Sequence, residues 1–375
     1  MSLKSLLLSS DDATVRVVRR VLSELDIRVE HCPAAEAAVR KITRERFEAI
    51  IVDCSGAEEA ASVLRTAKAA PVNQRALTIV LVDSAVGLRR GFEMGAHFVL
   101  HKPLSGERAK ASFRAVRALM KRERRRQMRV AVQVPVECRG SGSAARFKAK
   151  TLDLCEGGMA IQFSGATPNE NTLRFALDLP GMNRKFELEG ELAWEGDQAR
   201  VGVRFKSLTD DQLSALRQWL NGQLPEPEKD DPPVSCRLTD LSLGGCYLET
   251  NSPFPQGTRV ILSMKAGKVQ ARAGGVVRIT HPEYGMGVEF LSAAGKPDDQ
   301  VLCLIEALRA SGTQSPELQV EPDGLETVED IRQRATRPPA ETEDPLVELF
   351  RQKSQVSVEH FLAELRQQRQ MAATK

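Results

Sequence analysis

Apolar positions change their spacing along the chain, and these changes divide it into parts. Up to about Met120, short apolar runs typical of buried strands alternate with segments whose apolar residues have helical spacing. The predicted strands are Leu6–Leu8, Ala49–Val52, Thr78–Val82 and Phe98–Leu100, and the predicted helices are Thr14–Leu25 and about Gly106–Met120. Strands that alternate with helices indicate an α/β domain over residues 1–120, with a parallel sheet covered on both faces.

After Met120 the pattern is that of a β domain, with short strands separated by turns. The predicted strands are Val130–Val136, Arg146–Leu152, Met159–Phe163, Thr172–Asp178, Lys185–Trp194 and Arg200–Phe205. A helix then follows, since Thr209 and Gln212 have capping-box spacing and Gly222 stands at its expected end. We therefore expect a small barrel with a C-terminal helix over residues 121–222, entered through the basic run Lys121–Arg129 as a flexible hinge.

A second β domain repeats the first one after a proline-rich, charged linker at residues 223–233. The sequence Asp153–Gly158 recurs as Asp240–Gly245, and Val201–Phe205 recurs as Met286–Phe290, at offsets of 87 and 85 residues. Two anchors at nearly the same offset indicate an internal repeat. This second barrel is expected over residues 234–311, again with a terminal helix.

The C-terminal part has two different compositions. Residues 312–344 are rich in Pro, Glu and Thr and contain too few apolar residues for a core, so they are predicted to be disordered. Residues 345–375 regain helical spacing, with apolar positions at Leu346, Leu349, Phe350, Phe361, Leu362 and Leu365. One or two amphipathic helices are expected there, which either dock onto a partner or pack back on the body.

Composition limits the kinds of function that remain. The chain has 375 residues, of which 42% are hydrophobic, enough for two or three cores. A formal net charge of +3 gives no general attraction to nucleic acid, and aromatic residues are only 5% and do not interleave with the basic run. The seven cysteines form no C-x-x-C pair, which gives no zinc site. No segment has the length of a signal peptide or membrane span, so we expect a cytoplasmic protein.

The first 120 residues resemble the receiver domain of two-component response regulators. Asp53 ends the strand Phe47-Glu-Ala-Ile-Ile-Val-Asp53, and Lys102-Pro103 follows the strand that begins at Phe98. The resemblance implies the α/β flavodoxin-like fold, with Asp53 as the possible phosphoacceptor and Lys102 as the cation that pairs with the phosphoryl group. A carboxylate can accept a phosphoryl group only where cations neutralise the added charge.

This domain also departs from the receiver pattern. Ser9 and Ser10 occupy the places of the acidic pair that holds magnesium, and Asp11 and Asp12 come two residues later. Asp11, Asp12 and Asp53 are therefore only weak magnesium candidates, and no metal site is assigned. The expected hydroxyl residue falls at Asp83, or at Ser84 after a shift of one. These departures favour a degenerate docking or dimerisation module over a phosphorylatable receiver.

The first β domain resembles the PilZ domain, a small barrel that binds cyclic di-GMP. Its R-x-x-x-R signature matches Arg125 and Arg129, and its [D/N]-x-S-x-x-G turn matches Asp153, Cys155 and Gly158. The resemblance implies that the arginines contact phosphate or guanine and that Asp153 accepts from a guanine N–H. Cys155 replaces a serine, which exchanges a good hydrogen-bond donor for a weak one, at a cost of about 0.5–1.5 kcal/mol.

The second copy has the turn without the arginines. Asp240, Ser242 and Gly245 match the PilZ turn, but the preceding linker contains no arginine, and Arg237 lies too close to the turn. This turn is therefore the weaker ligand candidate, and the second barrel is expected to serve packing or protein contact.

Together these features predict a multidomain, bacterial, cytoplasmic signalling adaptor. Cyclic di-GMP is its regulatory ligand on the first barrel and reorients the receiver-like domain, and its partners are proteins not identified by the sequence. The alternative is a scaffold that binds only proteins, with degenerate receiver and PilZ-like domains. No catalytic motif, phosphate-binding loop or histidine cluster occurs, so neither an enzyme nor a cofactor is expected.

Overall fold

The computed structural model describes most of the chain in two compact units. The first unit comprises Met1–Glu123 and Asp231–Lys375, and the second comprises Arg124–Asp230. The described residues are 2–83, 90–140, 146–182, 185–206, 208–223, 231–291, 299–311, 316–326, 344–352 and 358–373. No helix in these ranges is both long and apolar enough to cross a membrane.

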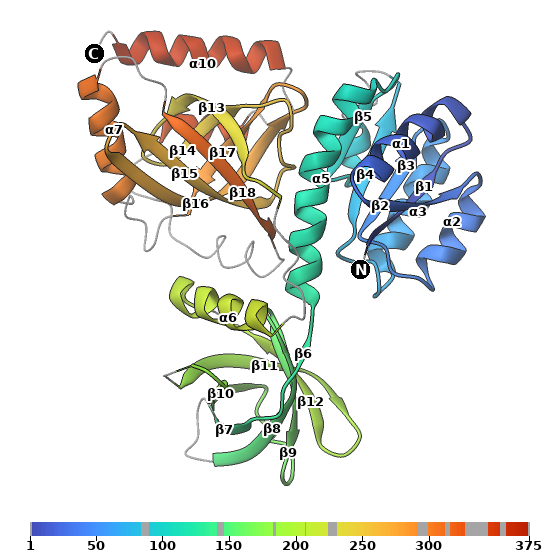
Figure 1. Ribbon diagram of the computed structural model, residues 1–375, viewed down its shortest axis with the longest axis vertical. Helices are drawn as coiled ribbons and strands as arrows, with labels where there is room; N and C mark the ends of the chain where they lie inside the picture. The colour runs from blue at the N-terminus through green and yellow to red at the C-terminus, as the bar shows by residue number, and fades with distance from the viewer. Residues whose placement is uncertain are drawn as a thin grey trace. The chain divides into compact units, whose positions relative to one another are not determined.

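The N-terminal domain is a five-stranded parallel sheet between two layers of helices (Figure 1). Its elements are β1 (Leu3–Leu8), α1 (Asp12–Glu24), β2 (Ile27–Cys32), α2 (Ala35–Ile42), β3 (Ala49–Asp53), α3 (Ala57–Ala69), β4 (Leu77–Val82), β5 (Phe98–His101) and α5 (Gly106–Gln127). The strand order β2-β1-β3-β4-β5 is the flavodoxin-like order. Alternate residues of the buried strands supply two cores, with Leu7 and Ile51 on one face and Leu6 and Ile50 on the other.

The four predicted strands and both predicted helices of this domain are confirmed, while β2, α2 and α3 were not predicted. Helix α5 is longer than expected, because it continues from Met120 to Gln127. The basic run that was expected to be flexible is thus mostly helical. Local contacts account for this: the Lys121 ammonium lies 2.9 Å from Asp231, and Glu123 accepts the Leu325 N–H at 2.7 Å.

The first barrel is a closed antiparallel sheet. Its strands are β6 (Val130–Ala131), β7 (Pro135–Gly140), β8 (Arg146–Cys155), β9 (Gly158–Phe163), β10 (Thr172–Leu177), β11 (Phe186–Gly196) and β12 (Arg200–Phe205), followed by α6 (Asp210–Gly222). The ring runs β8-β7-β10-β11-β12-β9 and closes through β8–β9. The predicted strand Val130–Val136 is two strands, separated before Pro135. The capping box of Thr209 and Gln212 is confirmed.

The second barrel is also closed by six strands, which confirms the predicted repeat. Its elements are β13 (Val234–Leu241), β14 (Gly245–Glu249), β15 (Thr258–Ala266), β16 (Val269–His281), β17 (Gly285–Phe290), α7 (Asp299–Ser311) and β18 (Glu317–Leu325). The ring runs β13-β14-β17-β16-β15-β18. Glycines at the start of β9 and of β14 allow each barrel to close.

The prediction of disorder over residues 312–344 is wrong for β18. This strand pairs with β13 on one side and β15 on the other, and it places Leu318 and Val320 in the core, at 3% and 0% exposure. A segment with only two inward apolar residues looks too polar for a core, but pairing on both sides satisfies its backbone. Residues 327–343 lie outside the described residues.

The two barrels have the same ring but different chain order. Strand β7 lies between β8 and β10 in the first barrel, and β18 takes the corresponding place between β13 and β15 in the second. Both are antiparallel to their two neighbours. The second barrel is therefore a circular permutation of the first, with its first strand supplied from beyond α7.

The C-terminal helices pack on the second barrel, which is one of the two alternatives left open by the sequence. Helix α9 spans Pro345–Gln352, and α10, which Figure 1 labels, spans Val358–Ala373. The apolar residues of this contact are Tyr247, Ile279, Leu346, Leu349, Phe350, Phe361 and Leu365. His281 lies beside them, 4% exposed, with its Nδ1 hydrogen-bonded to the Tyr247 hydroxyl at 2.9 Å.

We expect the second barrel to lose stability as the pH falls from about 6.5 to 4. Burial lowers the pKa of His281 from 6.5 to about 4, so in this interval the unfolded chain takes up a proton that the folded chain does not. The loss should reach about 3 kcal/mol. Urea unfolding at pH 7.5, 5.5 and 4.5 measures it, and a His281→Gln variant should show a flatter pH dependence. An unchanged slope in that variant would assign the effect to other groups.

Candidate functional site

Arg129 is placed beside Asp153 by the short strand β6. Val130 pairs with Leu154 and Ala131 pairs with Asp153. Arg129, which directly precedes β6, therefore lies beside strand β8. The Arg129 Nη1 donates to Asp153 Oδ1 at 2.6 Å, and the two side chains are 46% and 30% exposed. Burial by itself would lower the pKa of Arg129, but the bond to Asp153 outweighs it and raises the pKa. This pair joins two of the predicted ligand residues.

The other predicted residues of the first barrel have different surroundings. Arg125 lies in the last turn of α5, one turn before Arg129. Cys155 is only 7% exposed, so its thiol has little access to a ligand on the surface of the barrel. A Cβ on Gly158 would come 2.3 Å from the carbonyl oxygen of Val203, which makes this glycine a requirement of strand packing.

The turn between β8 and β9 is held by an ion pair that sequence reasoning missed. The Glu156 side chain is buried and accepts from Arg217 of α6 at 2.7 and 3.0 Å. Arg126 of α5 also lies 3.7 Å from the same carboxylate oxygen. No sequence motif pairs these residues, because Arg217 follows the turn by 61 positions.

Trp194 is a further residue that the sequence analysis did not identify. Strand register places Asp153, Ala160, Gly202 and Trp194 in one row across β8, β9, β12 and β11. The Trp194 indole lies over Gly202, where an added Cβ would come 2.0 Å from Nε1, and the residue is 48% exposed. Register shifts next to Asp153 and Trp194 mark β-bulges, which re-aim side chains.

We call this row the shelf of the first barrel. Three strand spacings separate its two ends, so it spans about 14 Å. One end carries a carboxylate with its guanidinium partner, the other carries an indole ring, and the two residues between them are small. Such a surface combines charge-assisted hydrogen bonding with a stacking partner. The sequence shows Trp194 only as the last residue of the predicted strand Lys185–Trp194, because the register that aligns it with Gly202, Ala160 and Asp153 exists only in the folded barrel.

Asp53 of the N-terminal domain is buried and fully hydrogen-bonded. Its Oδ1 accepts from Lys102 Nζ and from the Ser55 hydroxyl, both at 2.8 Å, and its Oδ2 accepts from the Ser9 hydroxyl at 2.7 Å. Burial by itself would raise the pKa of Asp53, but these donors outweigh it and lower the pKa. The structure thus brings Asp53 and Lys102 together as expected, and Lys102 also lies 3.1 Å from Asp83.

The other weak magnesium candidates, Asp11 and Asp12, lie at the start of α1. Asp11 is the N-cap of α1 and accepts from the backbone N–H groups of Ala13 and Thr14. Asp12 is exposed in the first turn of the helix. Among the described residues, no three His, Cys, Asp or Glu side chains are grouped so that they could hold a metal ion. Ser84 lies outside the described residues.

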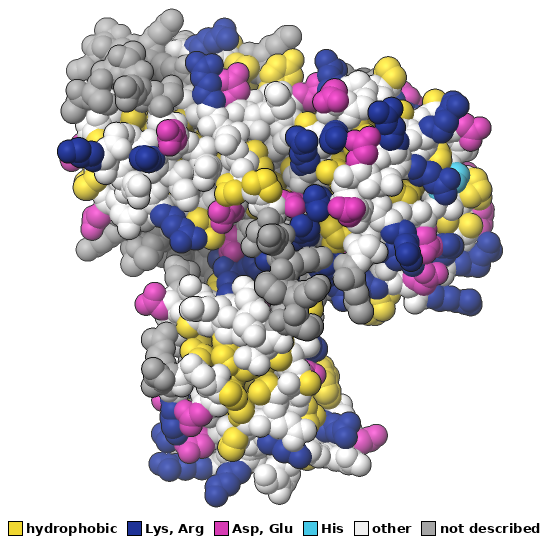
Figure 2. Space-filling view, viewed as in Figure 1, with side chains coloured by type: hydrophobic (Ala, Val, Ile, Leu, Met, Phe, Trp, Pro, Cys, Tyr) yellow, Lys and Arg dark blue, Asp and Glu magenta, His cyan; other side chains and the backbone are white. Residues whose placement is uncertain are grey.

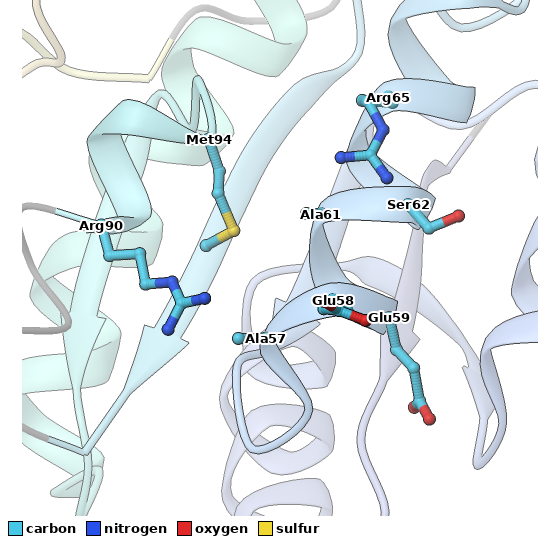
Figure 3. A pocket seen from close by; sticks show the side chains of 8 residues that line it. All are labelled: Ala57, Glu58, Glu59, Ala61, Ser62, Arg65, Arg90 and Met94. Carbon is cyan, nitrogen blue, oxygen red and sulfur yellow. The ribbon is translucent and has the colours of Figure 1, made fainter.

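A shallow pocket lies in the same domain, between α3 and residues 90–94 (Figure 3). Arg65 and Arg90 line it from its two sides, together with Glu58, Glu59 and Met94. Acidic and basic side chains are mixed there, so the lining does not select for one charge.

In the second barrel, backbone N–H groups of the predicted turn donate to side chains of the same chain. The Ser242 hydroxyl accepts the Gly245 N–H at 3.1 Å, and the Gly244 N–H donates to Asp344 Oδ2 at 2.8 Å. Asp240 lies on β13 beside this turn and is half-buried.

Removing the cation beside Asp53 should destabilise the N-terminal domain strongly. Lys102→Met leaves a carboxylate that is 3% exposed without its charge partner, at an expected cost of about 3–5 kcal/mol. Lys110→Met is the control, since its pair with Glu24 is 31% and 38% exposed and should contribute under about 1 kcal/mol. Chemical denaturation measures both, and equal effects would show that Asp53 does not depend on Lys102.

Comparisons with known proteins find a family match for the two barrels. The PilZ domain profile matches residues 123–222 and again residues 225–307. A search of curated proteins finds no match. Similar solved structures include the chemotaxis response regulator CheY4 of Vibrio cholerae, at 19% identity over 31% of this chain and 99% of that chain, with a TM-score of 0.29.

Two further solved structures are similar to parts of the chain. The receiver domain of the sensor histidine kinase PA1611 from Pseudomonas aeruginosa is 23% identical over 32% of this chain and 99% of its own, with a TM-score of 0.29. The PilZ domain of CeSA from a cellulose-synthesizing bacterium is 17% identical over 26% of this chain and 97% of its own, with a TM-score of 0.22. Residues 123–222 and 225–307 therefore match the PilZ domain, and they follow an N-terminal α/β domain with the flavodoxin-like strand order.

Proposed function

We propose that the chain is a cyclic di-GMP-binding signalling adaptor whose ligand binds the first PilZ barrel. The observation that carries this proposal is the Arg129–Asp153 pair at one end of a shelf that ends in the exposed Trp194. PilZ domains are cyclic di-GMP-binding modules, and this barrel combines the charged and aromatic groups that such a ligand requires.

The chemistry of each group suits a ligand with two phosphates and two guanines. Arg125 and Arg129 offer planar guanidinium groups for bidentate contacts to phosphate or to the O6 and N7 edge of guanine. Asp153 accepts a guanine N–H once Arg129 turns to the ligand. Trp194 provides a ring on which a base can stack. Cys155 contributes little, because its thiol is buried and a weak donor.

In this proposal, ligand binding changes the geometry of the connection between α5 and the first barrel, which we call the joint. Helix α5 ends at Gln127 and β6 begins at Val130, so only Met128 and Arg129 connect them. Arg125 precedes this joint and Arg129 belongs to it. A ligand that contacts both arginines favours those joint geometries that bring them together. This differential affinity is what a ligand needs to shift a conformational equilibrium.

The receiver-like domain serves as a docking module for a protein partner in this proposal. Asp53 already has Lys102 and two hydroxyl groups as donors, and Ser9 stands where an acidic magnesium ligand would be needed. Phosphorylation would have to break these bonds without a second cation in place. The adaptor is proposed to act in the cytoplasm.

If no nucleotide binds, the alternative is a scaffold that binds only proteins. Nucleic-acid binding has less support, because Lys and Arg side chains are interspersed with Asp and Glu on the face that Figure 2 shows. No enzymatic role is proposed, since the site groups described for the first barrel bind and stack but include no activated nucleophile.

Arg129→Ala should weaken cyclic di-GMP binding about 10- to 100-fold. It removes a charge-assisted hydrogen-bond donor, worth about 1.5–3 kcal/mol. Calorimetric titration of the full-length chain measures the change. Arg139→Ala is the matched control, because this exposed arginine on β7 belongs to the same barrel and lies outside the shelf. If the wild type and both variants bind cyclic di-GMP with equal affinity, Arg129 does not contact the ligand. If the wild type does not bind it, the protein-only scaffold is favoured.

Trp194→Ala should weaken binding about tenfold through the loss of base stacking. The chain has two tryptophans, and Trp219 is 7% exposed with its Nε1 bound to the Pro180 carbonyl at 2.8 Å. A ligand-dependent change in tryptophan fluorescence should therefore come from Trp194 and be absent in Trp194→Phe. A signal retained in that variant would place the ligand elsewhere.

A further inference from the structure

The second barrel has the same shelf as the first. Strand register places Asp240, Tyr247, Gly287 and Ile279 in one row across β13, β14, β17 and β16. This row corresponds strand by strand to Asp153, Ala160, Gly202 and Trp194. Register shifts also occur next to Asp240 and Ile279, the same two places as in the first barrel. The outer surface is therefore built alike in both repeats.

The C-terminal helices lie on this second shelf. A Cβ on Gly287 would come 2.6 Å from Cγ2 of Ile279, the residue that corresponds to Trp194, and 2.7 Å from the ring of Phe350. Phe361 of α10 lies beside Tyr247, with ring centroids 5.2 Å apart. Phe350 and Phe361 are 1% and 0% exposed. Aromatic rings of the chain itself thus cover the surface on which a base would stack.

An acidic residue of the same segment binds the turn. Asp344 Oδ2 accepts the Gly244 N–H at 2.8 Å, and its Oδ1 accepts the Leu346 N–H at 3.0 Å, at the start of α9. A Cβ on Gly244 would come 2.8 Å from Val347, so the helix sits directly on the turn. A carboxylate and aromatic rings together resemble the anionic and aromatic parts of a nucleotide.

The permuted chain order explains why the arginine clamp is missing here. In the first barrel, the segment with Arg129 leads into β7 by way of β6. In the second barrel, the corresponding strand β18 arrives from α7, and β13 is preceded by Pro232 and Pro233. No segment equivalent to the arginine arm enters this barrel among its described residues.

We propose that the second PilZ barrel is a helix-binding module whose resident ligand is residues 344–352 and 358–365 of the same chain. These residues lie on the shelf and exclude cyclic di-GMP from the second barrel. The exclusion of cyclic di-GMP rests on the proposed function of the first barrel. The binding of the helical segment does not.

The test is exchange of this segment with a peptide. The probe is a fluorescently labelled peptide of residues 344–373, added to the full-length chain and to full-length Phe350→Ala/Phe361→Ala. The tethered wild-type segment competes at an effective concentration of about millimolar. We expect the peptide to bind the variant at least tenfold more tightly than the wild type, measured by fluorescence anisotropy. A peptide that carries the same two alanines should bind neither chain.

Equal binding to both chains, or no binding to a variant whose circular dichroism is that of the wild type, would overturn the proposal. Hydrogen exchange on the unmodified chain provides a second test that needs no variant. The amides of α9 and α10 should be protected but exchange faster than those of β14 and β17, because the segment opens locally. If the amides of α9 and α10 exchange only by global unfolding, the segment is not a separable ligand. If they exchange as fast as in the free peptide, the segment is not bound.

Nucleotide stoichiometry separates this inference from the proposed function. One cyclic di-GMP per wild-type chain is expected, bound about 10- to 100-fold more weakly in Arg129→Ala. A second bound nucleotide that persists in Arg129→Ala would contradict its exclusion from the second barrel. Absence of any bound nucleotide, with peptide exchange as expected, would contradict only the proposed function of the first barrel.

Discussion

Both barrels depend on a strand contact so close that only glycine fits. A Cβ on Gly158 would come 2.3 Å from the Val203 carbonyl oxygen, and one on Gly245 would come 2.4 Å from that of Val288. These contacts bring the strand after the turn against its neighbour and close the ring. Both repeats have this contact, and both have bulges and an outer row in the same register, so one surface geometry occurs twice.

The two shelves differ in what the chain places on them. The first has an arginine at its charged end, an indole at the other end, and a large share of both exposed to solvent. The second is covered by α9 and α10, and its turn binds a carboxylate. The cause is chain order, because supplying β18 from the C-terminal side removes the arm that carries arginine. The two repeats thus share a scaffold but differ in the side chains and helices that lie on it.

The receiver-like domain shows the same separation between fold and chemistry. Its strand order and two-sided core are complete, and Asp53 meets Lys102 at the end of the sheet. The place of a metal-binding carboxylate is taken by the Ser9 hydroxyl, which donates to Asp53 instead. Asp53 is thus a buried carboxylate with hydrogen-bond donors at both oxygens.

The sequence alone predicted the fold classes of the domains and the charged end of the candidate site. Buried runs such as Ala49–Val52 and the repeated Asp-to-Gly turn depend on local patterns, and so does the spacing of Arg125 and Arg129. Tertiary structure decided what depends on register and on distant segments. Trp194 joins the shelf only through pairing across four strands, and β18 is a strand only because both of its neighbours pair with it. Helical spacing in the tail showed an apolar face, but its partner surface exists only in the folded barrel.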